Sequence, residues 1–183
     1  WWNDSIYCVG ISTEGIAAGL LASFYPKTLG IALLNTGGGL TPGEALSLST
    51  GLQLQEEGKN KSEIFGVQNK LKDSLRIADF HPQLSRQIKD HSYAWWASIQ
   101  HVRLLNLLIH VRFPVYYVFG SNDIYNTPLS YEKVIEDFKT EKKKNLFVNR
   151  LVGIDHNFND TLGNTHFEKI LRQTMTELLG QSL

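Results

Sequence analysis

The feature that most constrains the fold is a short apolar run near the beginning of the chain, which changes its pattern at a single glycine. Residues 5–9 are a serine followed by an apolar, partly β-branched run, whereas residues 13–25 are mostly small and apolar at helical spacing and stop at Pro26. Length and residue type predict a buried strand that turns sharply into a helix. Ser12 stands on this turn, two residues after Gly10, whose missing side chain leaves room for the helix to approach the strand.

Three more apolar runs predict further strands. Residues 29–34 follow the first helix after a short link, which makes a right-handed parallel unit with the first strand. Residues 113–120 and 146–152 predict a third and a fourth strand, and helical patterns follow them over residues 129–143 and 165–179. The sequence therefore predicts an α/β fold built on a parallel sheet.

Residues 40–112 have a helical pattern throughout, which is longer than a crossover between two strands requires. This length predicts a helical cap inserted into a core that consists of residues 1–39 and 113–183. Three aromatic residues of the cap are expected mainly in its own core, with contact to a substrate as the weaker interpretation: Phe65, Trp95 and Trp96.

The strand ends carry side chains suited to nucleophilic chemistry. Ser12, Asp123 and His156 each follow a predicted strand, and the carboxyl ends of parallel strands meet at one edge of a sheet. Attack by a hydroxyl on a carbonyl needs a base and an acid that orients the base. The alternatives are a helix cap for Ser12, a turn cap for Asp123 and a loop role for His156. Asp155 and Asp160 share the predicted loop of His156 and are less suited to orient it.

The order serine, aspartate, histidine and three local motifs resemble the α/β-hydrolase family. Gly10-Ile11-Ser12 resembles the nucleophile elbow, residues 114–123 resemble the segment that carries the acid, and residues 153–156 resemble the segment that carries the histidine. The resemblance covers essentially the whole chain, as the second half of the family fold. It implies that Ser12 is the nucleophile, Asp123 the acid and His156 the base. It also implies that the Thr13 amide binds the oxyanion.

The resemblance further implies a serine hydrolase that cleaves a small carboxylic ester or thioester through an acyl-serine, without a cofactor or a metal. A peptidase or an acyltransferase would use the same residues. The alternative is a catalytically silent domain used for binding or assembly. Glu14 favours this alternative, because the usual G-x-S-x-G pattern has its last glycine there and this chain has it at Gly15. The complete order of the three site residues opposes it.

Trp1 and Trp2 stand directly before the predicted buried strand, which leads us to expect that the chain is part of a longer one. In the family, earlier strands flank the elbow strand and supply a second oxyanion amide. We therefore expect the exposed edge of the first strand to pair with another copy in a homo-oligomer. We also expect this segment alone to hydrolyse esters poorly.

Charge balance, the lengths of the apolar runs and the cysteine count limit the classes of function that this chain can have. Eighteen basic residues balance eighteen acidic ones, so the net charge implies no attraction to nucleic acid or to an anionic membrane. No apolar run approaches the ~20 residues of a membrane span, and no signal peptide is visible, which leaves the cytoplasm as the default localisation. Cys8 is the single cysteine, so an internal disulfide is excluded, and its place in a strand predicts a buried, inert thiol.

Overall fold

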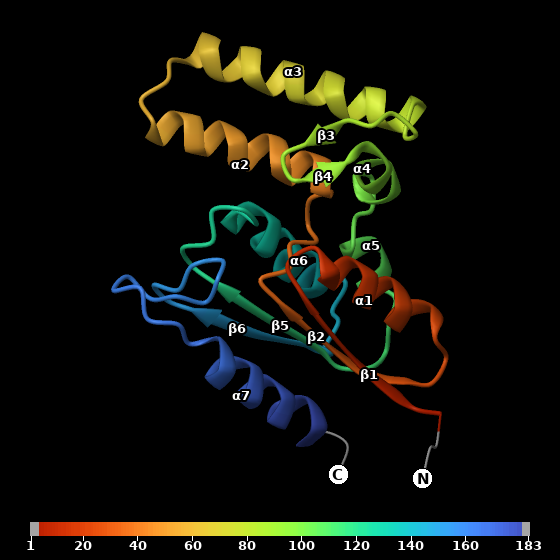
Figure 1. The fold of residues 1–183 in the computed structure, drawn as a ribbon. Coiled ribbons are helices and arrows are strands. Elements are labelled where there is room, and N and C mark those ends of the chain that lie inside the picture. The colour runs from red at the N-terminus through yellow and green to blue at the C-terminus, as the bar shows by residue number, and fades with distance from the viewer. Residues whose placement is uncertain (1–3, 181–183) are drawn as a thin grey trace.

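The computed structural model describes residues 4–180 and contains one parallel sheet of four strands (Figure 1). The strands, in their order across the sheet, are β1 (Ile6–Ile11), β2 (Thr28–Leu34), β5 (Val115–Gly120) and β6 (Leu146–Leu151). All three neighbouring pairs are parallel, and helices cover both faces of the sheet. The predicted α/β fold with a parallel sheet is confirmed.

The two central strands are buried on both faces, which explains their continuous apolar sequences. Ile31 and Leu33 of β2 face a cluster that includes α1 (Glu14–Phe24), α5 (Leu105–Leu108) and α6 (Pro128–Thr140). Ala32 and Leu34 face the opposite cluster, which includes α7 (Phe167–Gly180). Cys8 lies in the first cluster, and burial raises the pKa of its thiol.

A separate helical layer stands above the carboxyl edge of the sheet (Figure 1). It consists of α2 (Pro42–Glu56), α3 (Lys61–Phe80), a hairpin of β3 (Gln87–Ile88) and β4 (His91–Ser92), and α4 (Tyr93–Ile99). Its own core contains Leu75, Ala78, Ile88, Tyr93 and Trp96. We call this layer, residues 41–100, the cap.

The cap is shorter than the predicted residues 40–112. Leu104, Leu105, Leu108 and Val111 pack with the sheet and α1 rather than with the cap helices. Periodicity shows that such leucines lie on one face of a helix, but it does not show which layer covers that face. The hairpin β3–β4 was not predicted, because two-residue strands are too short to show alternation.

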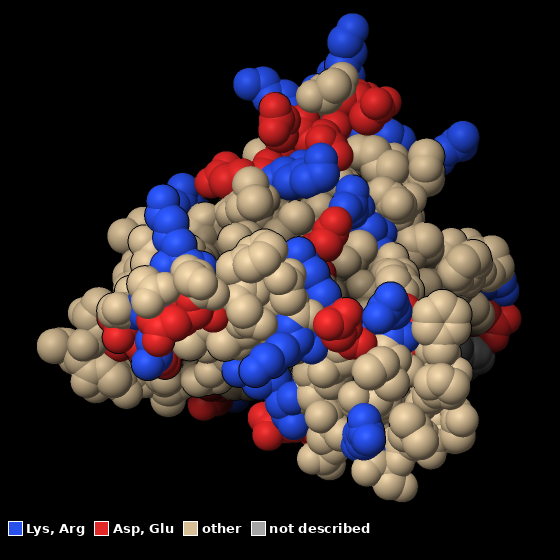
Figure 2. Space-filling view, turned by 90° about the horizontal axis from the view of Figure 1, so that it is seen from above, with Lys and Arg blue, Asp and Glu red and all other residues tan. Residues whose placement is uncertain are grey.

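Figure 2 looks down on the cap side of the molecule, where acidic and basic side chains are interspersed rather than gathered by sign. No helix within residues 4–180 combines the length and the apolar character that a membrane span requires. Within the same residues, no group of three or more His, Cys, Asp or Glu side chains is placed to hold a metal ion.

The association of this chain with a second copy stays a prediction. Substitutions on the surface around β1 and α1 can test it. Val9 on β1 is 36% exposed and Phe24 on α1 is 76% exposed. We expect light scattering at micromolar concentration to give about twice the mass of one chain, because such apolar surface favours association. Phe24→Lys should lower that mass, whereas Phe80→Lys, at the similarly exposed end of α3, should not. A single-chain mass at every concentration would contradict the prediction.

Candidate active site

Ser12 occupies a strained turn between β1 and α1. Its φ is +52°, in the left-handed region that costs a non-glycine residue on the order of 1–3 kcal/mol. The Ser12 N–H donates to the carbonyl of Leu34 at 2.9 Å, which ties the turn to the end of β2. Thr13, rather than Ser12, is the N-cap of α1, and no side-chain hydrogen bond caps that helix. The alternative of Ser12 as a helix cap is therefore wrong.

The close approach of helix and strand explains which glycines the turn requires. A Cβ on Gly10 would lie 2.3 Å from the Cα of Gly15, and a Cβ on Gly15 would lie 2.0 Å from Oγ1 of Thr36. Glu14 is exposed to solvent. The departure from G-x-S-x-G thus places the charged side chain outside the tight contact and leaves the turn intact.

Gly10→Ala should destabilise the protein by about 1–3 kcal/mol, because the new methyl group meets backbone atoms that cannot yield cheaply. Thermal or urea unfolding measures this change. Gly66→Ala is the matched control, since nothing lies within 4 Å of a Cβ at that position on α3. It should stabilise the helix by about 0.5–1 kcal/mol. Equal effects of the two substitutions would show that the Gly10 contact is not tight.

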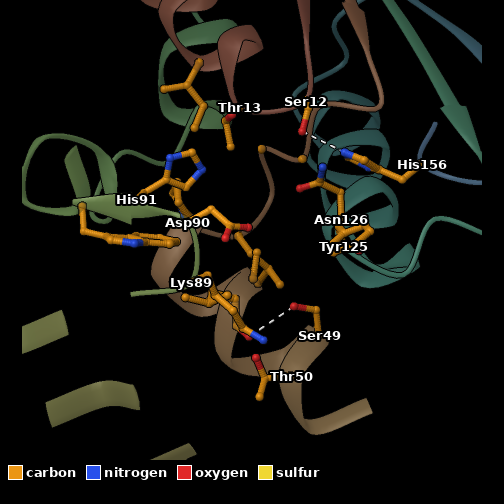
Figure 3. A pocket seen from close by; sticks show the side chains of 18 of the residues that line it. Ser12, Thr13, Ser49, Thr50, Lys89, Asp90, His91, Tyr125, Asn126 and His156 are labelled. Carbon is orange, nitrogen blue, oxygen red and sulfur yellow. Dashed lines mark hydrogen bonds between the residues drawn. The ribbon is translucent and has the colours of Figure 1, made fainter. Parts of the chain in front are cut away.

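Three side chains form a hydrogen-bonded chain at the carboxyl edge of the sheet, and Figure 3 shows its contact between Ser12 and His156. Oγ of Ser12 lies 2.8 Å from Nε2 of His156, and Nδ1 of His156 lies 2.9 Å from Oδ2 of Asp123. The His156 side chain is 16% exposed, and the carboxylate of Asp123 is fully buried. A hydroxyl, an imidazole and a carboxylate in this order are the components of nucleophilic acyl transfer.

The carboxylate of Asp123 is fixed by donors on both oxygens. Oδ1 accepts the N–H groups of Tyr125 and Asn126, each at 2.9 Å. Oδ2 accepts the phenol of Tyr131 at 2.5 Å in addition to its contact with His156. Burial, followed by the charge of Asp123, raises the pKa of Tyr131 well above its ordinary value, so the phenol remains a donor. Asp123 thus both caps its turn and contacts the histidine.

Asn35 holds the histidine loop in place, a role that was not predicted from the sequence. Its Nδ2 donates to the carbonyls of Asp155 and His156 at 3.1 and 2.8 Å. Its Oδ1 accepts the N–H of Gly120 at 2.8 Å, and Nδ2 of Asn126 donates to its carbonyl. Asn35 is fully buried with φ at +43°. A polar residue directly after a buried strand was the available signal.

The other two acids of this loop, Asp155 and Asp160, form hydrogen bonds within the loop itself. Oδ1 of Asp155 accepts the N–H groups of Asn157 and Asn159, both at 2.8 Å. Asp160 contacts Nε2 of His166 at 3.0 Å, and this hydrogen bond contributes most to lowering the pKa of Asp160 below its ordinary range. No hydrogen bond joins either carboxylate to the His156 ring among the described residues.

A cavity of about 550 Å³ lies between the hydrogen-bonded chain and the cap. Ser12, Thr13 and His156 line one end, and Trp95 and Trp96 of α4 contribute to its wall. Thr13 is the N-cap of α1, so its backbone N–H has no partner within the helix. The expectation that Phe65 lies in the core of the cap or contacts a substrate is wrong. Phe65 is 63% exposed on α3 and does not line the cavity.

No family model and no curated protein matches this sequence. Solved structures match the fold. An esterase of Pyrococcus furiosus matches with a TM-score of 0.57 and 11% identity, over 97% of this chain and 54% of that one. A monoacylglycerol lipase of Paleococcus ferrophilus matches with a TM-score of 0.55 and 14% identity, over 96% of this chain and 68% of that one. The chain has the α/β-hydrolase fold.

The α/β-hydrolase fold accounts for both the sheet and the cap, because these matches cover nearly all of this chain. The chain spans about half the length of the esterase and about two thirds of the lipase. An acylaminoacyl peptidase of Pyrococcus horikoshii also matches, with a TM-score of 0.56 and 11% identity, over 96% of this chain and 24% of that one. The fold is therefore shared by proteins with different activities, so the function of this chain depends on the residues of its site.

Proposed function

We propose that this protein is a serine hydrolase that cleaves a carboxylic ester or thioester through an acyl-serine intermediate. The observation that carries the proposal is the hydrogen-bonded chain from Ser12 through His156 to Asp123 at the wall of a cavity. The left-handed backbone of Ser12 supports it, because such strain concentrates at functional sites. The esterase and the lipase with the same fold also support it.

In the proposed reaction, Oγ of Ser12 attacks the carbonyl carbon while its proton passes to Nε2 of His156. Asp123 accepts the hydrogen bond from Nδ1 and stabilises the imidazolium that forms. The Thr13 amide donates to the oxyanion of the tetrahedral intermediate. The protonated His156 then gives its proton to the departing alkoxide or thiolate, which leaves the acyl group on Ser12. A water molecule, deprotonated by His156, hydrolyses the acyl-serine and restores the site.

A fluorophosphonate probe tests this proposal directly, because it reacts covalently with an activated serine. In the complete protein, we expect mass spectrometry after digestion to locate the label on the peptide that contains Ser12. Heat-unfolded protein is the control and should not be labelled, since activation depends on the contact with His156. A native protein that takes no label and hydrolyses neither nitrophenyl esters nor thioesters would instead favour a catalytically silent binding domain.

A further inference from the structure

The inner face of α2 is polar at the end of the cavity that lies away from Ser12. The residues of this helix that line the cavity are Pro42, Ala45, Leu46, Ser49, Thr50 and Gln53. The first three are apolar, and the last three are polar. Leu52 is 39% exposed, whereas Ser49 and Thr50 are almost fully buried. A helix that served only for packing would bury its leucine and expose its hydroxyls.

Thr50 provides a second observation at the same place. The residue is 7% exposed, and its Oγ1 has no hydrogen-bond partner among residues 4–180. Burial of an unpaired hydroxyl is unfavourable, so its presence in a folded protein calls for a structural or functional explanation. The neighbouring Ser49 donates to the carbonyl of Leu46 at 3.2 Å and keeps its lone pairs free to accept. The oxygen is covered in this structure, so a rotation about χ1 would be needed to bring the Thr50 hydroxyl to a ligand in the cavity that the residue lines.

Lys89 brings a positive charge to this end of the cavity. It lies in the turn between β3 and β4 with φ at +53° and lines the cavity. Figure 3 shows Lys89, Ser49 and Thr50 together, on the side away from Ser12 and His156. Lys89 takes part in none of the ion pairs found among residues 4–180. We call Ser49, Thr50 and Lys89 the distal subsite.

We propose that the distal subsite binds a carboxylate at the far end of the substrate's acyl chain. The substrate class is then the monoester or monothioester of a dicarboxylic acid. The proposal rests on the proposed function, which places the reacting carbonyl at Ser12. The Lys89 ammonium and the Thr50 hydroxyl donate to the carboxylate, and a single cation matches its single negative charge.

The chain length of the acyl group follows from the direction of α2. Pro42 and Thr50 both line the cavity, and the helix rises about 12 Å between them, so the cavity extends over a length of several methylene groups. Asp90 follows Lys89 in the same turn and also lines the cavity. Figure 3 shows Asp90 between Lys89 and Ser12, so its negative charge disfavours a carboxylate placed short of the subsite. A short diacid such as succinate should therefore be a poorer acyl group than adipate or suberate.

The kinetic test compares the mono-4-nitrophenyl ester of suberate with the same ester whose far carboxylate is methylated. We expect kcat/KM to be about tenfold higher for the free carboxylate, as for one charge-assisted hydrogen bond. Thr50→Val and Lys89→Met should each remove most of this preference, whereas Thr50→Ser should keep it. Lys142→Met is the matched control, because Lys142 is also exposed with φ at +53° but lies outside the cavity.

A binding test separates this proposal from the proposed function. Monomethyl suberate and dimethyl suberate are titrated calorimetrically into the Ser12→Ala protein, which needs no catalysis. We expect the monomethyl ester to bind about tenfold more tightly, and Lys89→Met to abolish the difference. Equal binding of the two esters to the Ser12→Ala protein, together with fluorophosphonate labelling of Ser12 in wild type, would overturn the distal subsite alone. Preferential binding of the free carboxylate without any labelling of wild type would overturn the proposed function alone.

Discussion

Ser12→Ala is expected to abolish fluorophosphonate labelling and to lower ester hydrolysis by on the order of 10⁴-fold or more. The reason is that His156 has no other hydroxyl within hydrogen-bond distance of its Nε2 among the described residues. Initial rates on a short nitrophenyl ester measure the loss. Ser74→Ala is the control, because Ser74 lies on α3 and bonds only within its own helix. An unchanged rate in the Ser12 variant would remove this residue from the mechanism.

Ser12→Gly separates the chemical role of this residue from its backbone strain. Glycine adopts a φ of +52° without penalty, so this variant should be more stable than wild type by about 1 kcal/mol and still be inactive. Urea unfolding and the same ester assay measure the two effects. A gain in stability together with a loss of activity is what a strained nucleophile predicts. A loss of both would show instead that the hydroxyl supports the fold.

The strands could be predicted because buried strands have continuous apolar sequences. β2 and β5 are covered on both faces, so most of their positions are apolar and each run ends where the chain leaves the sheet. The polar residues that follow β1, β5 and β6 could then be placed at one edge. This reasoning located Ser12, Asp123 and His156 without any knowledge of distances.

The supporting residues could not be predicted in the same way. Tyr131 lies in a helix as one of several apolar positions, and only the fold brings its phenol to Asp123. Asn35 acts through backbone groups of a loop 120 residues away, which no local pattern reveals. Thr50 has the sequence pattern of an ordinary polar residue on a surface helix, and only the packing around α2 buries it. Local periodicity records which face is buried, but not what a side chain meets there.

Asp123→Asn is expected to lower kcat by about 10⁴-fold while the protein stays folded. The amide can take only one orientation in this site. Two backbone N–H groups, from Tyr125 and Asn126, point at the position of Oδ1 and require an acceptor there. The amide oxygen must therefore occupy that position, which places the NH₂ group where Oδ2 was, against Nδ1 of His156.

This orientation of the amide reverses the tautomer of His156. An NH₂ group requires Nδ1 to accept, so the ring proton moves to Nε2, and Nε2 can then no longer take the proton of Ser12. Asp155→Asn and Asp160→Asn are the matched controls, because each keeps an amide oxygen for the N–H groups of its own loop. Both should retain activity within a few-fold of wild type in the same assay. A loss in either control as large as that in Asp123→Asn would assign the orienting acid to the histidine loop instead.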